Sequence, residues 1–290
     1  MKLANIRSSG ATRLAAVIGD EVFDLTAHLG PRFSEVTRFL ALGPEAHDMA
    51  RRCLKSEAVG VPVSSVELLS PILPGDKILG VGMNYRSFIA AAQRIGMPVP
   101  TDRIWFLRPR GCIAGPYDDV WLPRGAEDFD YEAELVIVIG RSCRHVSASA
   151  AKGVVAGFTV ANDLTLRQRV LKSTVLGKSF DTHTPLGPWL VTQDEIEPHE
   201  LAVRTWVNGQ LRQESNTAEL IANCYELVSE ISSLCTLNAG DVILTGTPAG
   251  SGIFQDPPSA LKIGDVVRIE IDGIGAIENR VVDEPATVAS

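Results

Sequence analysis

Phe-Asp-Tyr-Glu-Ala-Glu-Leu-Val-Ile-Val-Ile-Gly, residues 129–140, is the stretch of this sequence that decides the fold. It predicts a β-strand, because it is rich in β-branched residues and ends at a glycine. Glu132 and Glu134 are two positions apart, so on a strand both side chains point to the same face. Adjacent carboxylates repel unless a cation lies between them, and Mg²⁺, Mn²⁺ or Ca²⁺ suits oxygen ligands. Taken alone, the pair favours the simpler alternative of a solvated acidic face on an edge strand.

The composition narrows the class of protein. The chain has 290 residues, of which 45% are hydrophobic, enough for one large domain or a main domain with a small partner. Its net charge of −8, without a dense basic patch, argues against nucleic-acid binding. No apolar run approaches the roughly 20 residues that span a bilayer, and the N-terminus lacks the pattern of a signal peptide. Five scattered cysteines without a Cys-x-x-Cys pair favour buried thiols, so we expect a cytoplasmic protein that binds no membrane.

The first 70 residues differ from the rest of the chain, because they combine short strand-like runs with helical patterns. The strand-like runs are 2–6, 13–18 and 21–25, and the helical patterns are 32–42 and 44–55. We expect a small N-terminal α/β cap domain at residues 1–70. The prolines and glycine of residues 71–75 are typical of a linker, so the main domain is expected at residues 71–290.

The main domain is rich in strands. Apolar or β-branched runs occur at 78–82, 105–107, 120–123, 157–163, 201–207, 241–245 and 266–271. Asn208-Gly209 directly follows one of these runs and predicts a hairpin turn. The clearest helix is expected at Thr217–Ser232, where apolar residues recur at helical spacing. The pattern predicts an α+β protein that is mostly β.

Three further residues could complete a site around the two glutamates. Asp163 ends the next long strand after Glu134, so it could provide a third carboxylate from a neighbouring strand. A turn-forming Asn-Asp pair is the common local alternative. Lys178 could be drawn towards anionic substrate oxygens, although a lysine whose stem covers apolar surface is an ordinary alternative. His183 could orient a substrate, but a single histidine is more often structural.

A glycine-rich turn follows one of the later strands, with the sequence Thr-Gly-Thr-Pro-Ala-Gly-Ser-Gly at residues 245–252. Free backbone N–H groups in such a turn, near Gly246 and Thr247, can bind a carboxylate, and an ordinary tight turn is the alternative. Gly177-Lys178-Ser179 is like a fragment of a phosphate-binding loop. It lacks the upstream glycine spacing of such a loop, so we expect no nucleotide site.

Several short motifs occur together in one order along the chain. They are Gly82-Met83-Asn84-Tyr85, Gly115-Pro116, Leu122-Pro123, Asp130-Tyr131-Glu132-Ala133-Glu134-Leu135, Asn162-Asp163, Gly177-Lys178-Ser179-Phe180-Asp181, Pro185-Leu186-Gly187-Pro188, Val207-Asn208-Gly209, Gly240-Asp241-Val242-Ile243, Thr245-Gly246-Thr247-Pro248 and Gly264-Asp265. No single motif is specific, but together, across residues 77–282, they resemble the fumarylacetoacetate hydrolase family. Within that family, the chain resembles the acylpyruvate hydrolases and the 2-hydroxyhepta-2,4-diene-1,7-dioate isomerases.

This resemblance implies a fold, a cofactor and a substrate class. Family members have a mixed β-roll, usually in a homodimer, and use a divalent metal to act on 2-oxo acids and β-dicarbonyl acids of the acylpyruvate type. Carried over by position, Glu132, Glu134 and Asp163 correspond to the metal ligands. The expected cofactor is therefore Mg²⁺ or Mn²⁺, with Ca²⁺ as a further candidate, and the expected partner is a small 2-oxo acid.

The same resemblance implies roles for residues around the metal. Lys178 and the backbone at Gly246-Thr247 correspond to the groups that hold the 2-oxo acid end of the substrate. Arg167 matches an arginine that follows the metal aspartate, and with Lys178 it is a candidate catalytic residue. Tyr85 and His183 are further candidates for substrate contact.

The lid of the site departs from the family pattern. Hydrolytic members carry Asn-Tyr-x-x-His-x-x-Glu, in which the histidine activates water and the glutamate orients the histidine. The corresponding residues here are Phe88 and Ala91, and neither can carry a proton. Val170 also stands where the family often has a glutamine near the substrate.

The sequence leaves three functions open. The first is hydrolysis of a C–C bond in a 2-oxo or β-dicarbonyl acid, which follows the family assignment. The second is a metal-dependent lyase or isomerase (an oxaloacetate-type decarboxylase, a dehydratase or a tautomerase), which needs no lid histidine. The third is a non-catalytic homologue that binds metal and ligand. We favour an enzyme, because buried charges without a use are costly to keep.

Overall fold

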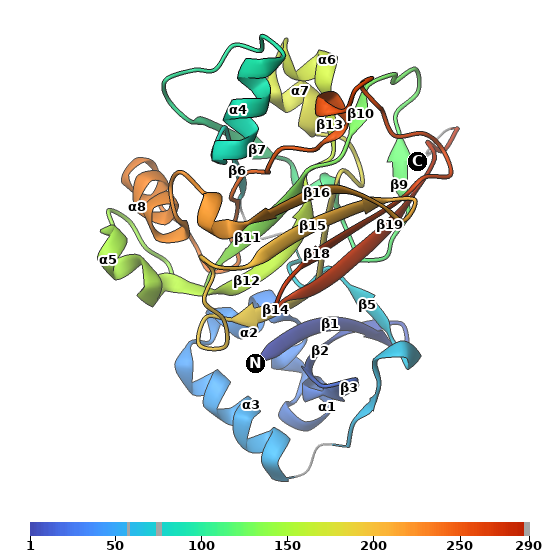
Figure 1. Ribbon diagram of the computed structural model, residues 1–290. Coiled ribbons are helices and arrows are strands. Elements are labelled where there is room, and N and C mark those ends of the chain that lie inside the picture. The colour runs from blue at the N-terminus through green and yellow to red at the C-terminus, as the bar shows by residue number, and fades with distance from the viewer. Residues whose placement is uncertain (57–58, 74–76, 287–290) are drawn as a thin grey trace.

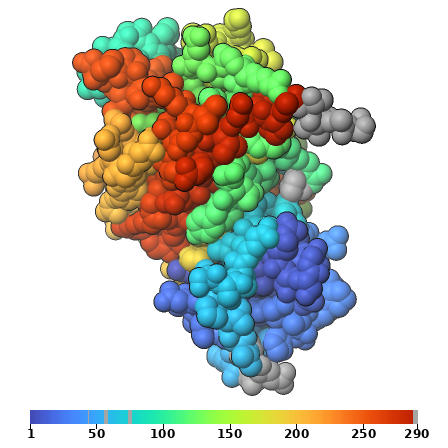
Figure 2. Space-filling model, turned by 90° about the vertical axis from the view of Figure 1, so that its right-hand side faces the viewer, coloured from blue at the N-terminus to red at the C-terminus, as the bar shows by residue number. Residues whose placement is uncertain are grey.

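The computed structural model describes residues 1–56, 59–73 and 77–286 and shows two lobes (Figure 1). The N-terminal residues form the smaller lobe, and the rest of the chain forms a larger body that is built mainly from strands. Figure 2 shows the smaller lobe, in blue, below this body in the view from the side. A strand of the smaller lobe pairs with a strand of the larger body, so one sheet runs through both lobes. No helix among the described residues has the length and apolar character needed to cross a bilayer.

The smaller lobe is an antiparallel meander covered by helices. Its elements are β1 (Lys2–Ser8), β2 (Ala11–Ile18), β3 (Glu21–Asp24), α1 (Leu25–Leu29), α2 (Val36–Ala41), α3 (Pro44–Ser56), β4 (Val61–Pro62) and β5 (Glu67–Leu69). The three predicted strands are confirmed. The first predicted helix begins later than expected, because residues 31–33 form a separate 3₁₀ turn, with a proline at its start. The sequence reasoning missed α1, which is only five residues long.

The sheet of the smaller lobe continues into the larger body. β1 pairs with β14 (Thr184–Thr192), so that Leu3 lies opposite Leu190. The predicted boundary at residue 70 therefore divides one continuous sheet, and it stays a prediction. Residues 74 and 75 of the predicted linker lie outside the described residues.

The central sheet of the body contains the strand that carries the two glutamates. After β14 the order is β12 (Val155–Asn162), β11 (Ala133–Ile139), β17 (Val242–Leu244), β6 (Ile78–Gly82) and β7 (Ile104–Arg108). The strand expected at residues 129–140 is interrupted, because β10 (Phe129–Asp130) pairs separately with β13 (Thr165–Leu166). The remainder, β11, is buried at every position between two neighbours. The edge-strand alternative is therefore wrong.

Burial on both faces explains the apolar sequence of β11. Leu135 and Ile137 belong to a core with the second sheet, whereas Val136 and Val138 face a core that includes the N-terminal helices. The second sheet contains β16 (Gln210–Asn216), β15 (Ala202–Val207), β18 (Val266–Ile271), β19 (Gly275–Asp283) and β9 (Val120–Leu122), in that order. β17–β6, β14–β8 (Ile113–Ala114) and β19–β9 are parallel pairs. The predicted α+β, mostly β fold with mixed sheets is confirmed.

Two local predictions in the second half of the chain can be checked directly. Asn208 and Gly209 form the two-residue turn between β15 and β16, with φ values of 52° and 77° that suit a type I′ turn. The helix expected at Thr217–Ser232 is α8 (Cys224–Leu234), so its predicted start was wrong. Asn223 caps this helix with a capping box, and the residues before it form a 3₁₀ turn and a strand bridge.

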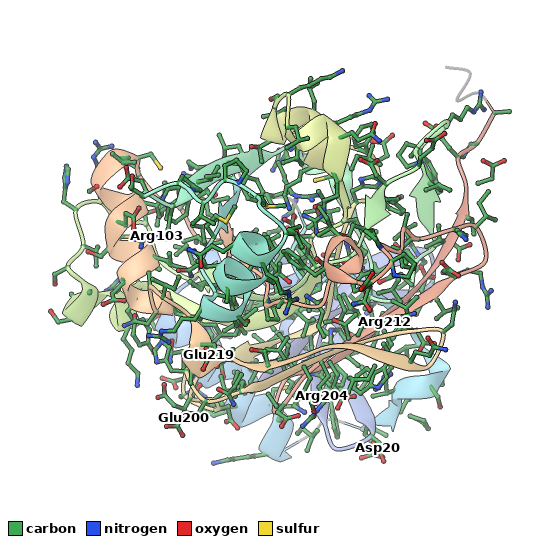
Figure 3. All side chains as sticks on the ribbon, turned by 45° about the horizontal axis from the view of Figure 1, so that its top comes forward. Asp20, Arg103, Glu200, Arg204, Arg212 and Glu219 are labelled. Atoms are coloured by element: carbon green, nitrogen blue, oxygen red, sulfur yellow. The ribbon has the colours of Figure 1, made fainter. Side chains whose placement is uncertain are left out.

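The remaining helices are α4 (Arg86–Arg94), α5 (Ala148–Ala151), α6 (Arg167–Val170) and α7 (Thr174–Lys178). Figure 1 places α4, α6 and α7 at the end of the body far from the small lobe. Figure 3 brings this end forward and shows α4 with side chains crowded between it and the strands behind. The site described next lies at this end.

Candidate metal centre and active site

Three carboxylates converge where β11 and β12 meet. Glu132 precedes β11, Glu134 lies on it and Asp163 follows β12. Ala133 pairs with Asn162, and Asp163 N donates a hydrogen bond to Glu132 O at 2.8 Å, which holds the two chain segments together. One oxygen from each carboxylate lies within 4.8 Å of those from the other two, and all three residues are buried. The structure therefore brings together the three residues that the sequence proposed as metal ligands.

A backbone group orients the Glu134 carboxylate, and a side-chain amide holds the backbone of Glu132. Gly246 N donates to Glu134 Oε2 at 2.7 Å, and Glu132 N donates to Asn162 Oδ1 at 3.0 Å. Gly246 has φ +99°, a conformation that glycine adopts readily, and a Cβ there would lie 3.0 Å from the Cβ of Asn84. The glycine-rich turn thus acts on a carboxylate of the protein itself.

Lys178, at the C-terminal end of α7, contacts two of the three carboxylates, those of Glu132 and Asp163. Its Nζ is 2.7 Å from Glu132 Oε2 and 2.8 Å from Thr165 Oγ1, and it also pairs with Asp163. Gly177 allows this position, because a Cβ there would lie 2.2 Å from Val170 Cγ2. The alternative of a surface lysine whose stem covers apolar residues is wrong, because Lys178 is only 6% exposed.

Two arginines add to the charge network. Arg167 pairs with Asp130 and Glu132, at 2.7 and 2.6 Å, and its Nη2 donates to Ser251 Oγ. Arg108 Nη2 lies 2.5 Å from Asp163 Oδ1, with both side chains fully buried. The sequence reasoning missed Arg108, which belongs to none of the motifs. An arginine at the end of an apolar strand is the only signal that could have indicated it.

Asp130 is a second residue whose role the sequence did not reveal. Its carboxylate accepts hydrogen bonds from Gly252 N at 2.6 Å and Ile253 N at 3.1 Å, and it also pairs with Arg167. It therefore joins the loop after residue 250 to the arginine that contacts Glu132. Gly252 has no room for a side chain, since a Cβ would lie 2.8 Å from Asp130 Oδ1.

The charges of the site affect its carboxylates unequally. Burial alone would raise the pKa of Glu132, but Arg167 and Lys178 outweigh it and lower that pKa to about 2. Glu134 forms no ion pair among the described residues, and burial together with Asp163 raises its pKa well above the usual range. Glu134 is thus the carboxylate whose negative charge the protein itself does least to compensate.

The donor set fits a divalent metal. With all four carboxylates ionised, Asp130, Glu132, Glu134 and Asp163 meet three cationic side chains, Arg108, Arg167 and Lys178, which leaves one net negative charge. A bound divalent ion would reverse this to one net positive charge. Buried oxygen ligands suit Mg²⁺ or Mn²⁺. The site with its ion would then attract an anionic substrate.

A cavity of about 740 Å³ opens from these carboxylates. Its inner end is lined by the three carboxylates together with Arg167, Lys178 and Thr247. Its outer wall is mainly apolar and comes from segments that are distant in sequence. This wall includes Met83, Phe88, Ile95, Met97, Pro98, Ile104, Phe106, Val170, Leu171, Ile253 and Pro258.

The other residues singled out from the sequence divide into two groups. Thr247 lines the cavity, and its Oγ1 accepts a hydrogen bond from Gln213 Nε2 at 3.0 Å. Tyr85 and His183 are fully buried and do not line the cavity. His183 packs on Phe129 and has its pKa lowered to about 3 by burial and the charge of Arg108. The structure therefore does not bring these two side chains to the cavity.

The lid positions are occupied as the sequence suggested. Phe88, on α4, lines the cavity and packs edge-on against Phe254, with ring centroids 5.0 Å apart. Ala91 is buried one turn further along α4 and lies outside the cavity wall. Within the described residues, α4 directs no titratable side chain into the cavity. Val170, the second departure from the family pattern, also belongs to the wall.

Comparison with known sequences identifies the family. The family model described as fumarylacetoacetate (FAA) hydrolase C-terminal matches residues 77–282. The mitochondrial oxaloacetate tautomerase FAHD2B of Homo sapiens is 41% identical over 269 residues, which cover 91% of this chain and 85% of that protein. The corresponding mitochondrial protein of Xenopus laevis is also 41% identical over 269 residues, which cover 91% of this chain and 83% of that one.

Solved structures agree with this result. Fumarylacetoacetate hydrolase from Exiguobacterium antarcticum has a TM-score of 0.86 at 31% identity, with 98% of this chain and 100% of that chain covered. Maleylpyruvate hydrolase from Sphingobium sp. SYK-6, solved with manganese(II) and pyruvate, has a TM-score of 0.83 at 30% identity and the same coverage. This chain therefore belongs to the fumarylacetoacetate hydrolase family. It is an enzyme of that family, and the non-catalytic alternative is no longer needed.

Proposed function

We propose that this enzyme transfers a proton at C3 of a 2-oxo acid, so that keto and enol forms interconvert, and that it depends on Mg²⁺ or Mn²⁺. The observation that carries this proposal is the apolar lid. Phe88 lines the cavity at the position where hydrolytic relatives are expected to carry a histidine. Hydrolysis needs a group that activates water. Tautomerisation consumes no water and breaks no C–C bond, so it has no need of that group.

The reaction requires a negative charge to be stabilised and a proton to be moved. When bound, a divalent ion at Glu132, Glu134 and Asp163 would polarise the substrate oxygens and lower the energy of the enolate. Lys178 is the group that we assign to the proton. In ketonisation the enol O–H loses a proton and C3 gains one, and the Lys178 ammonium can donate to C3 and recover the enol proton. Arginine is a poor alternative, because its guanidinium stays protonated.

Arg167 has a different role in this proposal. Its guanidinium contacts Glu132 and Asp130, so it keeps Glu132 in place while adding positive charge at the inner end of the cavity. That charge would help to hold the carboxylate of the 2-oxo acid. Thr247 lines the same end and could contact the substrate through its backbone or hydroxyl group. The names of the oxaloacetate tautomerases that are 41% identical to this chain support the reaction class.

Hydrolysis of an acylpyruvate-type C–C bond, the function that follows the family assignment made from the sequence, is the second candidate. Similarity to maleylpyruvate hydrolase at a TM-score of 0.83 is the observation that favours it. In that case water would have to be activated without a lid histidine. The two candidates differ in their products, because hydrolysis releases pyruvate and an acid whereas tautomerisation leaves the carbon skeleton intact.

Deuterium exchange at C3 tests the proposal. The enzyme is incubated in D₂O with oxaloacetate, 2-oxobutanoate or acetylpyruvate, with Mn²⁺ or with EDTA, and NMR and mass spectrometry follow exchange and products. Metal-dependent exchange without cleavage is expected. Metal-dependent release of pyruvate and acetate from acetylpyruvate, without faster exchange, would contradict the proposal and establish a hydrolase.

Substitution of two lysines, one in the site and one on the surface, tests whether Lys178 transfers the proton. Lys178→Arg keeps the positive charge but removes a side chain that exchanges protons, so exchange is expected to fall about 100-fold or more. Lys262→Arg, at an exposed lysine, is the matched control and should behave like the unchanged enzyme. Equal activity of Lys178→Arg and Lys262→Arg would remove Lys178 from the mechanism.

A further inference from the structure

The outer part of the cavity would contact the end of the substrate that lies away from the 2-oxo acid group. The inner end is charged and holds the metal ligands, Arg167 and Lys178. Beyond them the wall is formed by α4, the residues that follow it, β7, α6 and the loop after residue 250. Most side chains of this outer wall are apolar, and the polar exceptions are Glu127, Asp128, Gln168, Thr174 and Ser259. The wall therefore presents a different chemistry from the inner end.

The cavity is larger than a short 2-oxo acid needs. A pyruvyl unit has six non-hydrogen atoms, and at the roughly 30 Å³ that one water molecule occupies in the liquid it fills on the order of 180 Å³. The cavity has about 740 Å³. A pyruvyl unit at the carboxylates would thus leave most of the space to a substituent on C3.

The cations of the cavity are already engaged. Among the described residues that line it, only Arg167 and Lys178 are positively charged, and both pair with carboxylates of the inner end. Arg169, also on α6, places its guanidinium over the ring of Phe180 at 5.4 Å and does not line the cavity. A second carboxylate at the far end of a substrate would therefore meet no free cation there.

The charged side chains that do reach the outer cavity are acidic. Glu127 is exposed at its wall, and the neighbouring Asp128 accepts a hydrogen bond from the backbone N of Gln168. These carboxylates would repel a distal carboxylate of the substrate. Apolar side chains at the same wall remain open to solvent, with Leu171 84%, Ile95 47% and Ile104 41% exposed. Apolar surface beside an active site favours an apolar occupant.

We infer that the enzyme prefers 2-oxo acids with a single carboxylate and an apolar substituent of several carbons on C3, over 2-oxo dicarboxylic acids. This inference rests on the proposed function for the position of the 2-oxo acid end at the metal. It differs from the dicarboxylic acid that is named in the curated relatives. The apolar tail lies against Phe88, Ile95 and Leu171, and water leaves this surface when the tail binds.

Binding of unreactive analogues tests the inference separately from catalysis. Oxamate has the shape of pyruvate, and N-butyloxamate and N-(3-carboxypropyl)oxamate extend it with an apolar tail and with a tail that ends in a carboxylate. Titration calorimetry of the Mn²⁺-loaded enzyme measures each affinity. We expect N-butyloxamate to bind at least tenfold more tightly than oxamate, since each buried methylene contributes roughly a threefold to fourfold gain. N-(3-carboxypropyl)oxamate should bind less tightly than N-butyloxamate.

A charge introduced at the outer wall should change this preference. Leu171→Lys places a cation beside the tail and is expected to shift the ratio of the two affinities at least tenfold towards the carboxylate-ended analogue. Because Leu171 is 84% exposed, the substitution leaves the core intact. Leu176→Lys adds the same charge on α7 at a side chain that is 54% exposed and outside the cavity wall, so it should leave the ratio unchanged.

The outcomes separate this inference from the proposed function. Tail preference in binding, together with an absence of C3 exchange for every 2-oxo acid, would support the apolar tail and refute the tautomerase. Tighter binding of N-(3-carboxypropyl)oxamate than of N-butyloxamate to the unchanged enzyme would overturn the inference. Identical ratios for Leu171→Lys and Leu176→Lys would also overturn it, as would metal-loaded enzyme that binds none of the three analogues.

Discussion

Lys178 and Glu132, 46 residues apart in sequence, form a buried ion pair with 2.7 Å between Nζ and Oε2. The pair joins the end of α7 to the start of β11, and the same ammonium group also contacts Asp163. The residue that we propose to carry the proton and the proposed metal ligands are therefore parts of one network. Each change at this network should affect both metal binding and turnover.

Removal of divalent metal should lower the stability of the folded enzyme. A ligand that binds only the folded state, at 100 times its dissociation constant, stabilises it by about 2.7 kcal/mol. We expect Mn²⁺ or Mg²⁺ to raise the midpoint of thermal unfolding and EDTA to reverse the rise. Glu134→Gln should lose most of this metal response, because Glu134 is a proposed metal ligand that forms no ion pair among the described residues.

Glu214→Gln, at an exposed carboxylate of β16, is the control for that prediction. Its response to metal should equal that of the unchanged enzyme. A full metal response in Glu134→Gln would mean that the ion binds elsewhere. Differential scanning calorimetry with and without EDTA gives the comparison.

Gly177→Ala should displace Lys178. A Cβ at Gly177 would lie 2.2 Å from Val170 Cγ2 and 2.6 Å from Val170 N, so α6 and α7 must move apart. Such overpacking costs about 1–3 kcal/mol, and C3 exchange should fall with it. Gly153→Ala, where the nearest atom to a Cβ is Arg141 Nη2 at 3.8 Å, should change neither the urea unfolding curve nor the exchange rate. Full activity in Gly177→Ala would show that the position of Lys178 is not critical.

Phe88→His combined with Ala91→Glu should increase hydrolysis of acetylpyruvate. Residues 88 and 91 lie three apart on α4, so the two new side chains can contact each other while the histidine faces the cavity. A general base at this position is expected to increase release of pyruvate roughly tenfold or more. Phe88→Leu keeps the wall apolar and should bring no gain. If the folded double variant also releases no more pyruvate, the apolar lid does not explain the reaction class.

His183 should make stability depend on pH. Its pKa is about 3 in the folded enzyme, whereas an ordinary histidine, as in the unfolded chain, has a pKa of 6.5. Below pH 6.5 the unfolded chain therefore binds a proton that the folded enzyme does not bind. The free energy of unfolding therefore decreases as the pH falls. Between about pH 7.5 and about pH 5.5 this residue alone contributes a loss of about 1.4 kcal/mol.

Urea unfolding at the two pH values measures that loss. From about pH 7.5 to about pH 5.5, the free energy of unfolding of His183→Gln should decrease by about 1.4 kcal/mol less than that of the unchanged enzyme. His28→Gln, at an exposed histidine, is the control and should show the same decrease as the unchanged enzyme. Identical decreases in the unchanged enzyme and in His183→Gln would contradict the burial of a neutral imidazole.

Local sequence patterns predicted much of the fold. The β-branched run of β11, the Asn208-Gly209 turn and the strands of the small lobe follow from backbone preferences that act over a few residues. The start of α8 was misplaced, because the capping box at Asn223 outweighs helical spacing in the residues before it. The continuity of the sheet through β1 and β14 was also not predicted, since pairing between distant strands leaves no mark in either one.

In the candidate site, too, some features follow from the sequence and others only from the packing of distant segments. The sequence by itself determined which side chains could bind a metal, because Glu132, Glu134 and Asp163 stand at or next to the ends of two strand patterns and come together once β11 and β12 pair. Only the tertiary structure decided that Arg108 and Asp130 join this network, that His183 is excluded from the cavity, and that the outer wall is apolar. The physical reason is that charge compensation and cavity shape arise from groups that meet only when distant segments pack together.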